Sequence, residues 1–288
     1  MSRSFPDAIL VRVLRLLAFL SGCIVLFVFL HLVLEAWPAL ETPGLRRFLT
    51  DDAWRPAGGP PDARYGFAPM VVGSLAATLG AMLLAAPLGY CSAVFCHQCA
   101  PPRLRGAYRR IVELLAGIPS VVYGLWGLVT LAPLVRAIEP PGPSLLTGSL
   151  VLGLMILPTV ALLADAAFAS VPRAQLQAAA AVSLSRWRTL LAVHLPQARP
   201  GLWGALLLGT ARALGETMAV LMVCGNVIQV PKSVFNPVRT LTADIALELG
   251  YATGTHRSAL FVLWLFLMGA VVVLVAAAEL LGSNRARA

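Results

Sequence analysis

Charged residues are scarce in this sequence. Only 12% of its 288 residues are Asp, Glu, Lys or Arg, and Lys232 is its one lysine, whereas a soluble globular domain carries about a quarter charged residues. Hydrophobic residues make up 59% of the chain. These figures exclude an ordinary water-soluble domain and predict a protein that resides in a lipid bilayer.

Motifs for catalysis are also missing. No glycine-rich run ends in Lys-Ser or Lys-Thr, so the chain lacks the loop that cradles nucleotide phosphates, and we expect that it does not hydrolyse ATP itself. The four histidines, His31, His97, His194 and His256, are scattered, and they form neither a Ser-His-Asp arrangement nor a His-Glu-x-x-His motif. The sequence therefore predicts a protein that is not an enzyme.

A metal site is not predicted. Cys96, His97 and Cys99 have a spacing that occurs in metal sites, but no second pair of ligands follows them, and structural zinc needs about four ligands. The five cysteines lie in or beside apolar segments, where cysteine behaves as a small hydrophobic residue. We therefore expect no disulfides and no cofactor bound by this chain.

Long apolar segments occur from one end of the sequence to the other, and several approach or exceed the roughly 20 residues that cross a hydrocarbon core. We predict six spans, at about 13–37, 69–96, 111–135, 145–168, 201–224 and 258–281. The first is too long for a cleaved signal sequence. The fold class predicted is all-α, a polytopic transmembrane helical bundle with both termini on one side.

Arginines are distributed unequally between the two sides of this bundle. The side of the termini carries thirteen: Arg3, Arg12, Arg15, Arg103, Arg105, Arg109, Arg110, Arg173, Arg186, Arg188, Arg199, Arg285 and Arg287. The other side has eight basic residues, balanced by eight acidic ones. The positive-inside rule places both termini in the cytoplasm. Since anionic membrane lipid favours basic residues there, the net charge of +9 needs no nucleic-acid partner.

Two predicted loops are longer than a turn requires. The outer loop, 38–68, is rich in Pro and Gly and is expected to be irregular. The inner loop, 169–200, has strong helix formers between Pro172 and Pro196 and is expected to be helical. Such helices suit either docking of a partner protein or contact with lipid through Arg186 and its neighbours, and spacing does not decide between these roles.

The inner loop resembles the coupling loop of ABC importer permeases. The resemblance rests on Val171-Pro172, Gln177-Ala178-Ala179, Ser183 and Leu195-Pro196. The family usually has Glu and Gly where this chain has Gln177 and Ser183. The resemblance implies that residues 171–196, Arg186 among them, contact a separate ATPase subunit that uses ATP and Mg, and that they transmit its closure as a rigid element.

Two later runs resemble the PstC family, the permease subunits of phosphate importers. They are Ala211-Arg212-Ala213-Leu214-Gly215-Glu216-Thr217-Met218-Ala219-Val220, leading to Gly225-Asn226, and Asn236-Pro237-Val238-Arg239-Thr240-Leu241-Thr242. With Pro87-Leu88-Gly89 and the run 117–124, the resemblance covers about 48–281. It implies the type I ABC importer permease fold, with an N-terminal span and periplasmic loop over 1–68, a transmembrane domain over 69–281 and a cytoplasmic tail over 282–288.

The same resemblance implies a function and its partners. The chain is expected to import inorganic phosphate through the bacterial cytoplasmic (inner) membrane, together with a sister permease (PstA-like), two copies of an ATPase (PstB-like) and a periplasmic phosphate-binding protein (PstS-like). Two alternatives stay open. One is a permease for another oxyanion such as phosphonate, molybdate or sulfate, and the other is a membrane protein that senses phosphate status or acts as a scaffold.

Ionisable residues inside the predicted spans are costly, at about 2.5 to 3.5 kcal/mol near the centre. Arg212 and Glu216, four residues apart on a helix, would share one face and can form an ion pair. Alternatively, Arg212, Glu216 and Thr217 line the substrate pathway. Arg212 then meets the oxygens of the anion, and Glu216 accepts a hydrogen bond from a P–OH group that sulfate lacks. Asp165, near the cytoplasmic end of a span, can reach water or an arginine.

Overall fold

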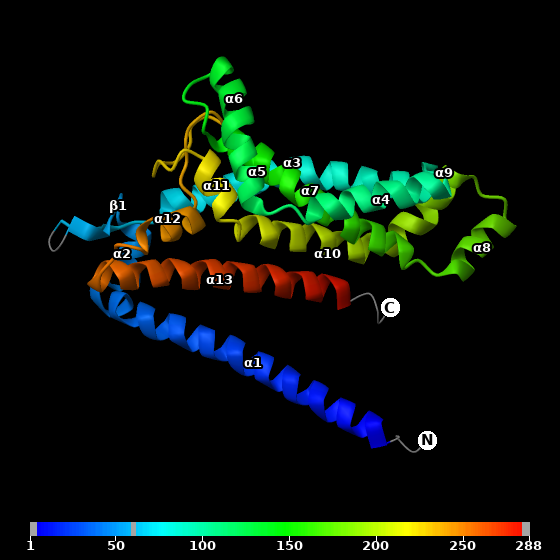
Figure 1. Cartoon of the computed structure of the whole chain (residues 1–288), viewed down its shortest axis with the longest axis horizontal. Helices are drawn as coiled ribbons and strands as arrows, with labels where there is room; N and C mark the ends of the chain where they lie inside the picture. The colour runs from blue at the N-terminus through cyan, green and yellow to red at the C-terminus, as the bar shows by residue number, and fades with distance from the viewer. Residues whose placement is uncertain (1–4, 59–61, 284–288) are drawn as a thin grey trace. The chain divides into compact units, whose positions relative to one another are not determined.

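The computed structural model describes residues 5–58 and 62–283, which are helical apart from one small β-ribbon and the connecting segments (Figure 1). They form two packing units: Met1–Gly66 with Glu248–Phe266, and Phe67–Leu247 with Leu267–Ala288. Several residues used in the predictions above lie outside the described residues: Arg3, Arg285, Arg287 and tail residues 284–288.

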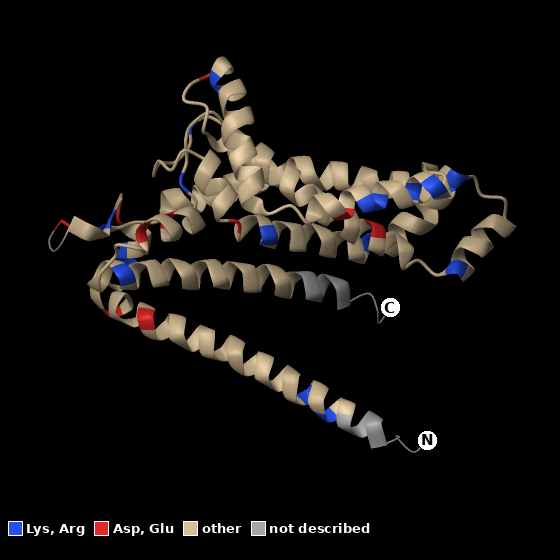
Figure 2. Ribbon diagram, viewed as in Figure 1, with Lys and Arg blue, Asp and Glu red and all other residues tan. Residues whose placement is uncertain are grey.

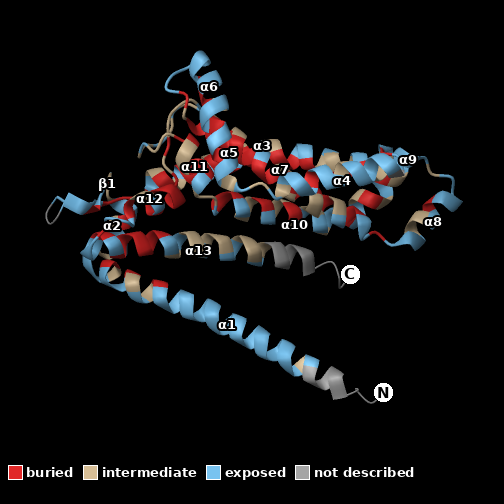
Figure 3. Cartoon of the chain, in the orientation of Figure 1, coloured by how far each residue is buried: buried red, intermediate tan, exposed pale blue. Residues whose placement is uncertain are grey.

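The first unit begins with the long helix α1 (Phe5–Ala39). It continues through a kinked π-helical turn, η1 (Leu40–Gly44), into α2 (Leu45–Thr50), and then into an antiparallel ribbon of β1 (Trp54–Arg55) and β2 (Arg64–Tyr65), with η2 (Pro56–Gly58) between the strands. From Leu10 onward most apolar side chains of α1 are exposed, as Figure 3 shows. A helix apolar all round is expected to face lipid.

The loop at 38–68, predicted to be irregular, contains short helices and a β-ribbon. Phe48 is fully buried, and its ring lies 5.6 Å from that of Tyr65. The Asp51 carboxylate accepts a 2.9 Å hydrogen bond from the Tyr65 N–H and pairs with Arg47 at 3.1 Å. Burial raises the pKa of Asp51, but these hydrogen bonds outweigh it and hold the pKa below its usual value. The loop therefore keeps a charged anchor at neutral pH.

A buried carboxylate joins this loop to a distant part of the same unit. Glu248 is the last residue of α12 (Leu241–Glu248), and His256 lies in the first turn of α13 (Gly254–Ser283). One oxygen of Glu248, Oε2, accepts from Trp54 Nε1 at 3.0 Å and lies 2.9 Å from His256 Nε2. The indole and the carboxylate are 194 residues apart in the chain.

The second unit holds α12 up to Leu247, the part of α13 from Leu267 on, and the elements not yet described, with α7 at its centre. These last elements are α3 (Ala68–Val94), η3 (Phe95–Cys99), α4 (Pro102–Ala116), α5 (Ser120–Trp126), η4 (Gly127–Leu131), α6 (Ala132–Ile138), α7 (Leu145–Ala169), α8 (Arg173–Ala181), α9 (Arg186–Thr189), η5 (Leu190–His194), α10 (Leu195–Leu214) and α11 (Met218–Val223). Helix α7 packs against α3, α10 and α4, and Figure 3 shows it as mainly buried.

Small residues let α3 and α7 approach closely. A Cβ atom added to Gly89 would lie 2.8 Å from Cγ1 of Val160, and one added to Gly153 would lie 2.9 Å from Cδ2 of Leu84. Membrane helices associate largely by van der Waals packing, which favours small residues at the contact. The backbone of α3 at Gly89 therefore lies directly against the Val160 side chain of α7.

Five helices among the described residues are long and apolar enough to cross a membrane: Leu10–Thr50, Ala68–Cys99, Ser120–Ile138, Leu145–Ala169 and Gly254–Ala277. The third begins later than predicted, because Pro119 disfavours helix at the residue before it and residues 111–116 belong to α4. The segment predicted as a span at 201–224 is divided between α10 and α11.

The packing of Gly89 can be tested by substitution. Gly89→Val places two methyl groups against Val160 and should cost about 1–3 kcal/mol through overpacking, lowering the thermal midpoint of the purified protein in detergent. Gly204→Val is the matched control, because no atom lies within 4 Å of the added Cβ there. Equal midpoints for the two variants would contradict close packing at Gly89.

Candidate functional site

A break in helical structure marks the first candidate site. Helix α10 ends at Leu214 and α11 begins at Met218, so Gly215, Glu216 and Thr217 form a non-helical connection inside an apolar segment. Non-helical backbone at membrane depth is tolerated only where it is buried in protein or lines a water-filled cavity. Gly215 is exposed, and Glu216 and Thr217 are partly exposed, which favours a cavity.

Side chains of the second signature run satisfy the polar groups at this break. Thr242 donates from Oγ1 to the Glu216 carbonyl at 2.7 Å, and Ser74 of α3 accepts from the Leu241 N–H at 2.9 Å. The Glu216 carboxylate accepts from the Ala219 N–H at 3.1 Å and so caps α11. The two runs that carried the family resemblance are therefore hydrogen-bonded to each other at the helix break.

Arg212 and Glu216 do not share one helix, so the same-face ion pair that the sequence suggested is wrong. Arg212 lies in the last turn of α10 and is exposed, while Glu216 lies past the helix end and is partly buried. No ion pair joins them in the part of the chain that the structure describes. Thr217 precedes α11 and donates to the Gly215 carbonyl at 3.4 Å.

A buried ion pair braces the segment beside the break. Arg239 Nη1 lies 3.0 Å from Oδ1 of Asp244, which is fully buried, and Arg239 Nε donates to the Asn226 carbonyl at 3.0 Å. The Val238 N–H donates to the Cys224 carbonyl at 2.8 Å. Arg239 and Asp244 thus connect the segment after α11 to α12.

The coupling loop is helical, as predicted. Gln177 and Ala178 are exposed on α8, Ala179 is buried, and Arg186 is exposed at the start of α9. Leu195 is partly buried, and Pro196 occupies the first turn of α10. Figure 2 shows basic residues at this end of the second unit, where α4, α8 and α9 lie.

Ser183 explains why the family pattern has glycine at its position. Its φ is 54°, in the left-handed region that costs most residues about 1–2 kcal/mol and that glycine adopts freely. The residue turns the chain from α8 toward α9, and the Leu184 N–H returns to the Ala179 carbonyl at 3.1 Å. Serine here keeps the turn but strains it.

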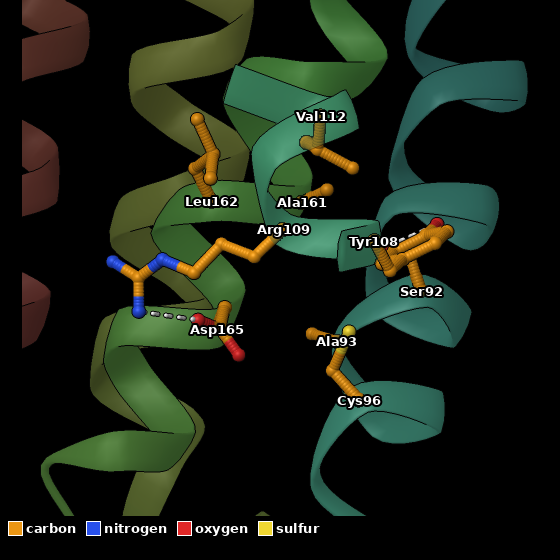
Figure 4. A pocket seen from close by; sticks show the side chains of 9 residues that line it. All are labelled: Ser92, Ala93, Cys96, Tyr108, Arg109, Val112, Ala161, Leu162 and Asp165. Carbon is orange, nitrogen blue, oxygen red and sulfur yellow. Dashed lines mark hydrogen bonds and ion pairs between the residues drawn. The ribbon is translucent and has the colours of Figure 1, made fainter. Parts of the chain in front are cut away.

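Asp165 near the end of α7 has the arginine partner that its position suggested. In Figure 4, Arg109 of α4 extends to Asp165, and its Nη1 lies 3.5 Å from Oδ2. His97 of η3 lies closer, with Nε2 at 2.9 Å from Oδ1. His97 thus pairs with a carboxylate. Among the described residues no group of three or more His, Cys, Asp or Glu side chains is placed to hold a metal.

Comparison with known proteins decides the family. Residues 85–285 match the family described as binding-protein-dependent transport system inner membrane component. The chain belongs to this family. Its members are transporter membrane components and not catalysts, and this chain is accordingly a multi-pass inner membrane component rather than an enzyme.

Relatives of this inner membrane component include curated permeases. The chain is 42% identical to the probable ABC transporter permease protein YqgH of Bacillus subtilis (strain 168), over 72% of this chain and 67% of the relative. It is 33% identical to the phosphate transport system permease protein PstC of Mesorhizobium japonicum, over 96% and 90%. The resemblance to the PstC family is confirmed.

Solved structures confirm the fold of the inner membrane component. A bacterial alginate ABC transporter, in complex with an alginate-bound periplasmic protein, matches with a TM-score of 0.64 at 16% identity, covering 98% of both chains. The MetNI methionine ABC transporter matches with a TM-score of 0.57 at 19% identity, over 76% of this chain and 94% of that one. The predicted type I importer permease fold is therefore confirmed.

The buried ion pair of this inner membrane component generates the first prediction about the site. Asp244→Asn leaves Arg239 without its carboxylate, which typically costs about 3–5 kcal/mol, so the thermal midpoint in detergent should fall sharply. Adding Arg239→Gln should recover part of the loss, because the uncompensated charge is gone. Glu35→Gln is the control, since it breaks an exposed pair with Arg257 at 3.6 Å, worth about 0–1 kcal/mol.

The strained turn generates a second prediction. Ser183→Gly should stabilise the coupling loop by a net of about 0.5–1 kcal/mol, seen as slower hydrogen exchange of the amides in residues 173–194. Ser185→Gly, two residues on, should do the reverse by a few tenths of a kcal/mol, because Ser185 has a φ of −65° and its Oγ caps α9 at the Arg188 N–H. Slower exchange in both variants would contradict strain at Ser183.

Proposed function

We propose that this chain is the permease subunit of an ATP-driven importer that moves inorganic phosphate from periplasm to cytoplasm. The support for phosphate is the group of relatives named phosphate transport system permease protein PstC, which are 30–34% identical over most of the chain. The signature runs that suggested this family interlock around the helix break, and the candidate pathway is built from residues of the first run.

One observation carries the pathway: an exposed arginine stands one turn from an exposed helix break. Arg212 is the last basic residue of α10, and its guanidinium has no carboxylate partner among the described residues. An unpaired charge in a membrane segment is stable only where water or a substrate anion meets it. The guanidinium offers a planar fork of donors that fits phosphate oxygens.

Glu216 has a narrower role in this proposal than the sequence suggested. One of its oxygens accepts from the Ala219 N–H and fixes the start of α11. The other oxygen is left to accept a hydrogen bond from the P–OH group of a passing phosphate. Thr217, beside it, is the remaining residue of the proposed pathway.

Exposed apolar surfaces of the chain support the proposal of partner subunits. The coupling loop exposes the large apolar residues Val182, Trp187 and Leu191, which suit a protein groove better than water. We assign this surface to a separate ATPase subunit, present in two copies, that uses ATP and Mg. A sister permease completes the pathway, a periplasmic phosphate-binding protein delivers the anion, and both termini lie in the cytoplasm.

Uptake of radiolabelled phosphate tests the proposal. The assembled complex and its binding protein in proteoliposomes should take up phosphate only with ATP, and excess sulfate should not compete. Arg212→Gln should lower uptake at least about tenfold, the equivalent of about 1.4 kcal/mol. Glu216→Gln keeps the cap of α11 but changes a carboxylate to an amide, and should reduce the preference for phosphate over sulfate.

Arg199→Gln is the matched control, because Arg199 is exposed on the same helix but about 20 Å from Arg212 along its axis. It should leave uptake near the wild-type rate. A wild-type complex that hydrolyses ATP without moving phosphate would contradict phosphate import, and sulfate, molybdate and phosphonate would be tested next. Equal losses in the Arg199 and Arg212 variants would remove Arg212 from the pathway.

A further inference from the structure

The turn η3, at the end of α3, contacts both ends of the coupling loop. Asp165 lies four residues before the end of α7, where the chain enters the loop. His194 is the last residue of η5, directly before α10, where the chain leaves it. His97 and Gln98, neighbours in η3, contact Asp165 and His194 respectively.

The contact at the loop entrance is a shielded polar pair. Nε2 of His97 lies 2.9 Å from Oδ1 of Asp165 and 3.2 Å from its backbone carbonyl oxygen. Both side chains are 18% exposed. Arg109 approaches the second carboxylate oxygen from α4, as Figure 4 shows, and also binds Glu113 at 3.0 Å. Asp165 thus ties α7, η3 and α4 together.

The contact at the loop exit is a hydrogen bond between neutral groups. Nε2 of Gln98 lies 3.4 Å from Nδ1 of His194, and because an amide nitrogen only donates, the ring nitrogen accepts. Burial lowers the pKa of His194, which keeps the ring neutral and able to accept. The ring is 9% exposed.

An aromatic ring fills the space between the two contacts. Phe168, 2% exposed, has its ring centroid 5.7 Å from that of His97 and 6.4 Å from that of His194. The same buried cluster contains Val171 and Leu190, at the two ends of the loop. The ends of the coupling loop are therefore packed in the same buried cluster as Phe168 of α7, in addition to being joined to α7 and α10 through the chain.

The adjacent positions of His97 and Gln98 in η3 make the double contact possible. Successive side chains on a helix point in different directions, so the two residues reach partners on different elements. The backbone of this turn is itself held, since Arg105 donates from Nη2 to the His97 carbonyl at 3.2 Å. Isolated π-helical turns occur frequently at functional sites.

We propose that His97, Gln98, Asp165 and His194, which we call the clasp, transmit movement of the coupling loop to the transmembrane helices. The clasp residues are positioning residues, since they meet neither ATP nor the transported anion. When the loop moves, both its ends pull on η3, which continues into α3, and α3 packs against α7 and α10. Helix α10 carries Arg212, so a shift of the loop reaches the proposed pathway through packed elements.

Separate measurement of ATP hydrolysis and phosphate uptake tests the role of the clasp. This inference rests on the proposed function, because it takes the coupling loop to be the contact with the ATPase. In the proteoliposome system, Asp165→Asn and Gln98→Ala should each lower the phosphate moved per ATP hydrolysed at least threefold. They should also weaken the stimulation of hydrolysis that the binding protein produces. Glu113→Gln is the matched control, because it removes the other carboxylate of Arg109 but no clasp contact, and both readouts should keep their wild-type values.

A merely structural role gives a different result. Loss of folded complex would lower hydrolysis and uptake in proportion and leave their ratio unchanged, and an unchanged ratio in both clasp variants would overturn the inference. Gln98→Ala is the milder change and keeps the test open if Asp165→Asn fails to assemble. If the wild type moves no phosphate, the proposed function fails instead, and the clasp is judged by the stimulated hydrolysis alone.

Discussion

A membrane protein must supply partners for every backbone amide and carbonyl that it places away from water, and the break between α10 and α11 depends on this constraint. Glu216 presents its carbonyl to Thr242 and its carboxylate to the Ala219 N–H, while Ser74 holds the chain next to Thr242. The break persists because the side chains of Thr242 and Glu216 bond backbone groups that a continuous helix would have paired internally. An exposed arginine can then stand beside it.

Charge is distributed by the same logic. Buried or shielded polar side chains have partners, as with Arg239 and Asp244 or His97 and Asp165, and the second of these pairs joins residues 68 positions apart in the sequence. Arg212 contrasts with them, since it is exposed on a helix of an inner membrane component. Paired charged residues hold the helices of this molecule together, whereas Arg212, without a carboxylate partner, belongs to the proposed pathway. An ionisable residue inside a membrane protein is by default a candidate for a functional site.

Hydropathy predicted most of the spans, because the energy of placing apolar side chains in lipid is a local property of the sequence. It did not predict the division of 201–224, since Gly215, Glu216 and Thr217 are surrounded by apolar residues, and Thr242, the partner of the Glu216 carbonyl, is 26 residues away in the sequence. The helical coupling loop followed from composition and two prolines. The contacts of η3 did not, because they join residues 68 and 96 positions apart, and periodicity contains no information about such pairings.

The hydrogen bond between Trp54 and Glu248 determines when, during synthesis of the chain, the first packing unit can be completed. Trp54 donates its indole N–H to a carboxylate 194 residues further on. At about 5–20 residues per second, a ribosome needs about 10 to 40 s to synthesise that interval. The β-ribbon is therefore synthesised long before its partner exists, and the first packing unit is completed only after residues 248–266 have been made. Helix α1 is thus made first, but its packing unit is complete only after the beginning of α13 has followed.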